Sequence, residues 1–486
     1  MTDQAPASRL RRSARHAALL ASAAVIMLGI AVEHPWTRET ASAARMTTPV
    51  RAQPVPHQPG FAEIVAKVKP AVVSVQVKLD EAASAVETSS QDGDDASPHQ
   101  PGKRGEFVTA VGSGFFISSD GYLVTNHHVV DHARTVQVTT DAGQTYSAKV
   151  IGTDKSSDLA LLKVDASDLP YVSFADEAPR IGDWVVAVGN PFGLGGTVTA
   201  GIVSARGRDI GSGPYDDYIQ IDAPINRGNS GGPAFNVDGK VVGVNTAIYS
   251  PSGGSVGIGF DIPAGTVKRV VQQLKENGHV TRGWLGVQAQ AVTAEIAESL
   301  GLSSARGALV DEPQPDSPAA KAGIKAGDVI TAVNGAAVDN SHDLARTIAQ
   351  IAPGTSVRIG VRRDGDERSI QVTLGTLPAE RQAQVHKTEA APSARGGRLG
   401  LTIAPADKVA GAGNRGAVVT AVEPAGVASE HGVQVGDVIL RVGSADVAGP
   451  ADVRTAIATS RKQGKHAVLM QVKSGDATRF VALPLG

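Results

Sequence analysis

The chain has 486 residues, a formal net charge of −2, 55 glycines, 4% aromatic residues and no cysteine. A charge so near neutral excludes a global basic field for nucleic acid. The lack of cysteine excludes a disulfide framework, a thiolate nucleophile and a cysteine-based zinc site. The length suits about three domains, and abundant glycine among valine and isoleucine runs favours mainly β structure with tight turns.

The N-terminal segment 1–43 is predicted to direct export. An arginine cluster at 9–15 precedes the apolar run 17–32, which has the length of a signal-peptide hydrophobic region. Small residues at 41–43 would suit a signal peptidase, but they lie far from the apolar run, so an uncleaved membrane anchor is the alternative. Residues 44–60, rich in alanine, proline and threonine, predict a flexible tether.

A helix and a strand begin the first folded domain, which we expect to span residues 61–280. Apolar residues at helical spacing run from 61 to 69, and Pro70 ends that helix. The apolar run 71–77 predicts a strand. Residues 81–106 carry serine, aspartate, glycine and proline without periodicity, which indicates a long exposed loop.

The segments around two histidines and one aspartate could supply a base and its orienting carboxylate. A strand over 112–117 and a turn precede a second strand that is expected to end in His127 and His128. Asp158 opens an apolar run, so it can lie at the edge of a core and face a histidine. Adjacent residues of an extended segment point to opposite faces, which disfavours a metal ion shared by the two histidines.

The heptad 227–233 (Arg-Gly-Asn-Ser-Gly-Gly-Pro) is the best candidate for a nucleophile turn. Small residues around Ser230 favour a tight turn that presents its hydroxyl. The same turn would converge the amides of Gly228, Asn229 and Ser230, as the oxyanion of an acyl-transfer intermediate requires. The heptad alone would suit an ordinary turn equally well. A serine needs a base to act as a nucleophile, and the chain order His, Asp, Ser matches a known order for such a triad.

Three motifs in this order resemble the HtrA/Deg family of serine proteases. They are Thr-Asn-His-His-Val at 125–129, Asp-Leu-Ala-Leu-Leu at 158–162 and Gly-Asn-Ser-Gly-Gly-Pro at 228–233. The resemblance implies that His128, rather than its neighbour His127, is the base. It implies Asp158 as the carboxylate and Ser230 as the nucleophile. The competing carboxylates are Asp154, which lacks an apolar run after it, and Asp165, where the chain turns to solvent.

The resemblance implies a mainly β fold, with a chymotrypsin-like double β-barrel followed by two small α+β domains. Short β runs divided by glycine, aspartate and proline fill residues 107–262 and suit six strands per barrel. An amphipathic helix over 266–277, ending at Gly278, is expected to close the protease domain.

Two repeats follow at nearly equal spacing and resemble PDZ domains of the circularly permuted bacterial type. They span 281–377 and 397–486, with a linker over 378–396. Each contains a Leu-Gly-apolar segment. These segments are Leu285, Gly286 and Val287 in the first repeat and Leu399, Gly400 and Leu401 in the second.

The resemblance implies that the amides of each Leu-Gly-apolar loop receive the carboxylate of a peptide with a hydrophobic C-terminus. The adjoining strand would pair with that peptide by β-augmentation. Helices over 342–352 and 451–459 would form the other wall of each groove. Their apolar residues would line the groove or belong to the core. These residues are Leu344, Ile348, Val453 and Ile457.

The resemblance also implies a specificity pocket and a regulatory loop. Ile225, Ala247 and Ile248 match segments that line the primary pocket, which implies cleavage after valine, alanine or similar residues. Plain barrel core is the alternative for these three residues. The glycine-rich stretch 205–217 matches a loop that orders on activation, and within it we expect Arg208 to relay contact from the first PDZ domain. A merely exposed arginine is the alternative.

Taken as a whole, the resemblance implies a periplasmic serine endopeptidase for unfolded or misfolded exported proteins. Apolar side chains of the kind such a pocket prefers are mostly buried in folded substrates. Family members are built on homotrimers or multiples of them, and a membrane tether is compatible with the N-terminus. No metal, cofactor or nucleic acid is implied. The alternatives are a chaperone or peptide-binding scaffold, alone or beside proteolysis, and an esterase with the same triad.

Overall fold

The computed structural model describes residues 60–79, 109–191, 196–251, 253–378, 399–409, 411–475 and 477–485. The predicted export segment and the tether, up to residue 59, lie outside these residues. So do the loop 81–106 and the linker 378–396 beyond residue 378. Within the described ranges no helix is both long and apolar enough to cross a membrane.

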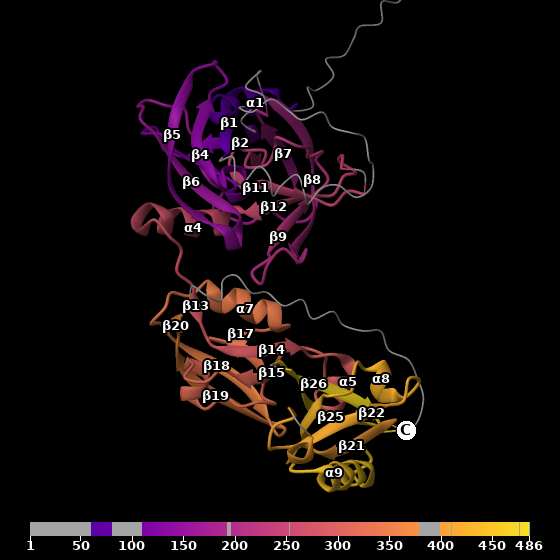
Figure 1. Ribbon diagram of the computed structural model, residues 1–486. Helices are drawn as coiled ribbons and strands as arrows, with labels where there is room; N and C mark the ends of the chain where they lie inside the picture. Colours follow the sequence, from indigo (N-terminus) through magenta and orange to yellow (C-terminus); the bar gives the residue numbers. More distant parts are fainter. Residues whose placement is uncertain are drawn as a thin grey trace, which may run out of the picture. The chain divides into compact units, whose positions relative to one another are not determined.

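Two closed antiparallel barrels of six strands each form the first domain (Figure 1). This confirms the predicted chymotrypsin-like architecture. The first barrel has the order β1-β2-β3-β6-β5-β4. Its strands are β1 (Val72–Leu79), β2 (Thr109–Phe116), β3 (Tyr122–Thr125), β4 (Ala133–Thr139), β5 (Thr145–Asp154) and β6 (Leu159–Val164).

The second barrel has the order β10-β11-β12-β9-β8-β7. Its strands are β7 (Trp184–Gly189), β8 (Thr197–Arg208), β9 (Tyr218–Ile221), β10 (Pro233–Phe235), β11 (Val241–Ile248) and β12 (Gly259–Pro263). Helix α1 (Ala62–Val68) runs into the short 3-10 helix η1 (Lys69–Ala71), which holds Pro70. Helix α4 (Ala264–Asn277) ends at Gly278, whose φ of 74° suits glycine.

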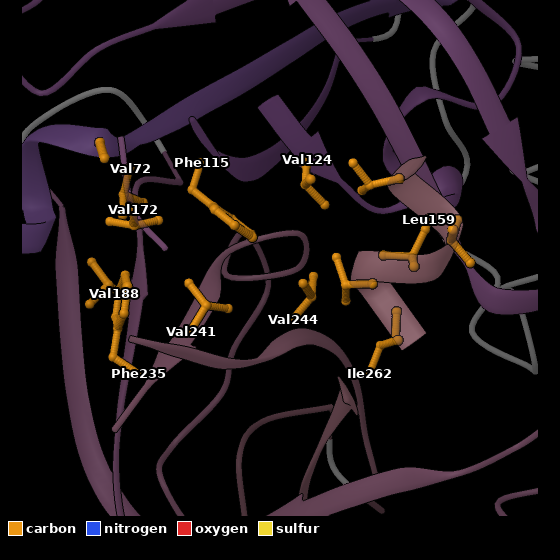
Figure 2. Packing of buried hydrophobic residues seen from close by; sticks show 14 of the residues in the cluster. Val72, Phe115, Val124, Leu159, Val172, Val188, Phe235, Val241, Val244 and Ile262 are labelled. Carbon is orange, nitrogen blue, oxygen red and sulfur yellow. The ribbon is translucent and has the colours of Figure 1, made fainter. Parts of the chain in front are cut away.

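The two barrels share one apolar cluster. Phe115 and Val124 of the first barrel lie in it with Val188 and Phe235 of the second (Figure 2). Leu274 of α4 belongs to the same cluster. Such close packing fixes one barrel against the other, so that residues from both can form a single site.

Two sheets of the same topology follow. In the first the order is β14-β15-β16-β18-β19, and in the second it is β21-β22-β23-β25-β26. In both sheets a further two-residue strand pairs with the third strand of this order, and β14 and β21 lie at the sheet edges. The equal topology confirms that the chain carries a duplicated α+β domain.

The elements of the first repeat are β13 (Gly283–Trp284), β14 (Val287–Ala291), α5 (Ala294–Leu300), β15 (Ala308–Pro313), α6 (Pro318–Ala322), β16 (Val329–Val333), β17 (Ala336–Ala337), α7 (Ser341–Ala349), β18 (Ser356–Arg363), β19 (Asp366–Thr373) and β20 (Gly375–Thr376). Those of the second are β21 (Leu401–Pro405), η4 (Ala406–Lys408), β22 (Ala417–Val422), α8 (Val427–Glu430), β23 (Val438–Val442), β24 (Ala445–Asp446), α9 (Pro450–Lys462), β25 (Ala467–Ser474) and β26 (Ala477–Pro484). Helices α7 and α9 correspond to the helices expected over 342–352 and 451–459.

One local prediction was wrong. The second strand was expected to continue into the two histidines, but β3 ends at Thr125 and the single-turn helix α3 (His127–Val130) follows. The first amides of a helix lack partners inside it. Here the N–H of His127 donates to the carbonyl of Asp158 at 3.1 Å, and the N–H of His128 donates to Asp158 Oδ1 at 2.9 Å. The argument from opposite faces of a strand therefore does not apply to these residues.

Strand β12 carries a buried carboxyl group without a partner. Asp261 is fully buried, and neither of its side-chain oxygens has a hydrogen-bond partner among the described residues. Burial raises the pKa of Asp261 to about 8, because an ionised carboxylate loses its hydration in the core. The native protein therefore holds Asp261 protonated at neutral pH.

Replacing Asp261 should change how stability depends on pH. Between the unfolded pKa of 3.8 and about 8 the native state holds a proton that the unfolded state releases. Stability from this group therefore falls as pH rises through that window. We expect the free energy of unfolding of Asp261→Asn, minus that of the parent, to increase by a few kcal/mol between pH 4 and pH 8. Calorimetry of the protease-domain transition against pH measures this. The control is Asp168→Asn, an exposed turn position with a φ of 58°. Parallel pH profiles for parent and Asp261→Asn would contradict the prediction.

Candidate active site

A histidine and an aspartate meet where α3 approaches the start of β6. His128 Nδ1 lies 2.8 Å from Asp158 Oδ2. Thr246 of β11 also donates its hydroxyl hydrogen to Asp158 Oδ2. Burial acts to raise the pKa of Asp158, but the bonds from His128 and Thr246 outweigh it and hold that pKa below its usual range. The ionised carboxylate therefore favours the tautomer with hydrogen on Nδ1, which leaves Nε2 of His128 to accept a proton.

The competing carboxylates are engaged or exposed elsewhere. Asp154 at the end of β5 is buried against Arg282, with contacts of 2.9 Å and 2.5 Å to the guanidinium. It also accepts a hydrogen bond from Ser157. Asp165 lies exposed beyond β6. Among the three candidates, only Asp158 is hydrogen-bonded to His128 in the part of the chain that the structure describes.

The Ser230 turn is held to the same part of β11. The N–H of Gly231 donates to the carbonyl of Asn245 at 2.8 Å, and Asn245 Nδ2 donates to the carbonyl of Gly232 at 2.9 Å. Asn245 directly precedes Thr246, which binds Asp158. Consecutive residues of one strand thus bind the serine turn and the carboxylate.

Three backbone amides were expected to converge on an oxyanion, but one of them is already hydrogen-bonded within the turn. The N–H of Asn229 donates to the carbonyl of Asn226 at 3.0 Å. The amides of Gly228 and Ser230 remain as candidate donors to an oxyanion. Gly228 has a φ of 94°, and a Cβ there would lie 2.2 Å from Pro191 Cβ, so this position requires glycine.

Ser113 of β2 links these parts and was missed by sequence reasoning. Its side chain is fully buried, and its Oγ donates to the carbonyl of Gly228 at 2.6 Å. The same Oγ accepts from the N–H of Asn190 at 2.8 Å. Its own N–H donates to the carbonyl of Ser230 at 2.8 Å, and its carbonyl accepts from Thr125 Oγ1 at 2.7 Å. The only signal in the sequence is a serine between two glycines in an apolar strand.

Only two of the three residues expected to line a specificity pocket pack in the same cluster. Ile225 is buried in an apolar cluster of the second barrel, and half-buried Ile248 packs against that cluster. Ala247 packs against the cluster shared by the two barrels instead. Neighbouring residues of a strand face opposite sides of the sheet, which explains why Ala247 and Ile248 separate.

The Leu-Gly-apolar loops of the two repeats use their carbonyls in the same way. Leu285 accepts from the N–H of Ala319 at 2.9 Å, as Leu399 accepts from Ala428 at 3.2 Å. The next carbonyls, of Gly286 and Gly400, accept from Gln314 and Glu423, each at 2.8 Å. Both glycines have positive φ values, of 77° and 61°. Val287 and Leu401 then begin the edge strands β14 and β21.

The loop after β8 contacts the first repeat through residues other than Arg208. Arg208 Nε donates to Gln220 Oε1 at 2.9 Å, within the second barrel. Asp217 Oδ1 lies 2.9 Å from Arg346 Nη1 of α7. His342 Nε2 donates to the carbonyl of Asp216 at 2.6 Å.

Models of known families match three parts of the chain. A trypsin-like peptidase domain matches residues 112–244, and PDZ domains match 283–374 and 389–473. Together with the two closed barrels, these matches define a trypsin-like serine peptidase that carries two PDZ domains.

Relatives and solved structures narrow this class. A probable periplasmic serine endoprotease, DegP-like, of Brucella melitensis is 48% identical over 88% of this chain and 90% of its own length. One with the same description from Rhizobium meliloti is 46% identical over 90% of this chain and 94% of its own length. The structure of the HtrA-type protease AlgW with a tripeptide shares 38% identity and a TM-score of 0.56, and covers 66% of this chain and 98% of that one. The chain belongs to the HtrA family of serine endoproteases.

Ser113→Ala should impair turnover more than substrate binding. The variant loses the hydroxyl that holds the Gly228 carbonyl, so the adjacent amides lose their fixed direction. Since losing one oxyanion donor costs about 10²–10³ in turnover, we expect a fall in kcat of about 10- to 100-fold with a nearly unchanged KM. Steady-state kinetics on a peptide substrate measures both constants. Ser74→Ala is the matched control, because Ser74 is equally buried and its Oγ has no partner in the described part of the chain. Equal kcat values for the two variants would refute a positioning role.

Proposed function

We propose that His128, Asp158 and Ser230 form the catalytic triad of this endopeptidase. The observation that carries the proposal is the binding of Asp158 to His128 and Thr246, beside the Asn245 contacts that hold the Ser230 turn. Asp158 orients His128 and stabilises its charged form. His128 is the general base, and Ser230 is the nucleophile.

The reaction follows from these roles. His128 Nε2 takes the hydroxyl proton of Ser230 as Oγ bonds to the carbonyl carbon of a peptide. The carbonyl oxygen becomes an oxyanion, which the amides of Gly228 and Ser230 stabilise. Histidine then gives its proton to the leaving amine as the C–N bond breaks. Water attacks the acyl enzyme with His128 again as base and releases the carboxylic acid.

Unfolded or misfolded exported polypeptides are the proposed substrates. Ile225 and Ile248, on one side of the second barrel, support a small apolar pocket that accepts valine, alanine or similar residues. The tandem PDZ domains support protein rather than ester substrates, because such domains recognise extended peptides. We infer that the loops at Leu285–Val287 and Leu399–Leu401 receive hydrophobic C-termini.

We infer a periplasmic location, with 1–43 as a signal peptide or an anchor. The names of the relatives support this location. The proposed divisions are 44–60 as tether, 61–280 as protease, 281–377 and 397–486 as PDZ domains, and 378–396 as linker. The match that begins at residue 389 suggests that the second PDZ domain takes in the end of that linker.

A homotrimer, or a multiple of it, is the proposed assembly, with the segment near Phe61 at the contact. Phe61 packs on Trp184 with ring centroids 5.5 Å apart, although the Trp184 side chain is 54% exposed. Ile181 is 67% exposed. A contiguous exposed apolar patch is a usual sign of an interaction surface, and we propose that Phe61, Ile181 and Trp184 belong to one. We further propose that the loop 205–217 regulates activity through its contact with α7, with Arg208 supporting the loop through Gln220.

Ser230→Ala should abolish proteolysis. The mature chain is expected to cleave unfolded casein, whereas the variant loses the nucleophile and leaves casein intact. Fragment analysis by gel and mass spectrometry measures this. Equal cleavage by both proteins would show that Ser230 is not the nucleophile. If neither cleaves, even with hydrophobic C-terminal peptides added, a chaperone or scaffold function becomes the better reading.

Ile248→Ala should shift the cleavage preference towards larger apolar residues such as leucine. The substitution removes three carbons from the proposed pocket, so a larger side chain can enter. Mass mapping of casein fragments measures the residue before each cut. Ala247→Gly is the matched control, since Ala247 packs against the other cluster and should leave the preference unchanged. An unaltered preference in Ile248→Ala would remove this residue from the pocket.

A further inference from the structure

The second PDZ domain has a groove with a charged wall. Residues 399–401 line one side of the groove, and Arg454, Ile457, Ala458 and Arg461 of α9 line the other. The spacing i, i+3, i+4 and i+7 places these four side chains on one face of the helix. The groove therefore presents two guanidinium groups with an apolar stretch between them.

The shape of this groove fits an extended peptide. Strand β21 lies at the edge of its sheet, so its outer backbone groups are open to a further strand. A peptide added there would have α9 as its second wall. This inference rests on the proposed peptide binding by the PDZ domains and concerns which peptides the second one selects.

Both arginines have hydrogen-bond donors to offer. Arg454 is exposed and has no partner in the described part of the chain. Arg461 is exposed and gives one bond, from Nη2 to the carbonyl of Leu485 at 2.8 Å, which leaves most of its five donors. Asp452, on the same helix, accepts from the N–H groups of Ala448 and Gly449 and is thus engaged. The acid nearest the loop is Glu423, whose Oε2 lies beside Gly400.

The separation of the two arginines suits a short peptide segment. Seven residues of α-helix span about 10 Å, and an extended chain advances about 3.3 Å per residue. If one arginine lies beside the last residue of the peptide, the other lies about three residues upstream. It can then reach the side chains two and four residues before the last, which face the same wall. An apolar terminal residue would contact Ile457 and Ala458.

The first PDZ domain lacks these charges. Asp343 of α7 and Asp452 of α9 are equivalent, since each carboxylate accepts an N–H from the residue four positions before it. Counting from these aspartates, Ala345 stands at the position of Arg454. Helix α7 ends at Ala349, so it has no helical residue at the position of Arg461. The positive wall is therefore a difference between two domains of the same topology.

We propose that the second PDZ domain selects acidic C-terminal segments, in which glutamate or aspartate precedes an apolar last residue. The first PDZ domain binds uncharged apolar termini. Exposed ion pairs are individually weak, so the preference of the second groove is about 3- to 10-fold in Kd and declines as salt screens it.

Fluorescence anisotropy on full-length Ser230→Ala, which cannot digest the probe, tests this selectivity. Two labelled ten-residue peptides end in valine and differ only in carrying glutamate or glutamine at the third and fifth positions from the end, which share a face with the last residue of an extended chain. The glutamate peptide is expected to bind about 3- to 10-fold more tightly. Adding Arg454→Gln should reduce that preference, and adding Arg461→Gln as well should abolish it. Adding Arg415→Gln instead, at an exposed arginine outside the groove, should preserve it.

The remaining outcomes separate the two hypotheses. Equal affinity for both peptides in the Ser230→Ala parent would overturn the charge selection and leave peptide binding intact. An acid preference that survives both arginine substitutions would also overturn it. If neither peptide binds, the proposed peptide binding by the PDZ domains is refuted, and charge selection with it. Thermal unfolding of each variant shows that the second PDZ domain is still folded.

Discussion

The candidate site depends on the way Asp158 is held. Its backbone has a φ of 53°, in the left-handed region, between the 3-10 helix η2 (Lys155–Ser157) and β6. In this conformation its carbonyl accepts from His127 N–H and Asn126 Nδ2, while its carboxylate accepts from His128 and Thr246. One residue thus fixes the first turn of α3 and ties it to β11 of the other barrel. A shift of Asp158 would displace His128 and move the carboxylate away from Thr246 together.

The serine turn depends on a second buried polar group. Ser113 binds the Gly228 carbonyl with its side chain and the Ser230 carbonyl with its amide. Polar groups in a core are costly unless they are paired, and Ser113 satisfies the turn's carbonyls without solvent. Because Ser113 lies in β2 of the first barrel, both barrels again contribute. The apolar cluster around Phe115 and Phe235 keeps these contacts in register.

Much of the architecture could be read from the sequence, because strand and turn signals are local. The proposed grouping of Ser230 with His128 and Asp158 rested on the resemblance, since residues far apart in the sequence are brought together only by the fold. The helix at His127 was missed because its stabilising acceptor, Asp158, lies 30 residues away from His128. Ser113 and Thr246 escaped prediction because a buried hydroxyl has no periodic pattern. Ala247 was grouped with Ile248 because sequence adjacency hides the alternation of a strand.

The duplicated domains show where such a fold can vary. Gly286 and Gly400 have positive φ, and a Cβ at either would lie 3.0 Å or less from its neighbours, so the loop position is constrained in both copies. Arg454 and Arg461 are exposed on α9, and an exposed position tolerates exchange of alanine for arginine with little effect on the fold. Duplication therefore allows two grooves to keep one backbone while Arg454 and Arg461 give the second a different charge. If the proposed selectivity holds, two kinds of chain terminus engage one protease without any change to its barrels.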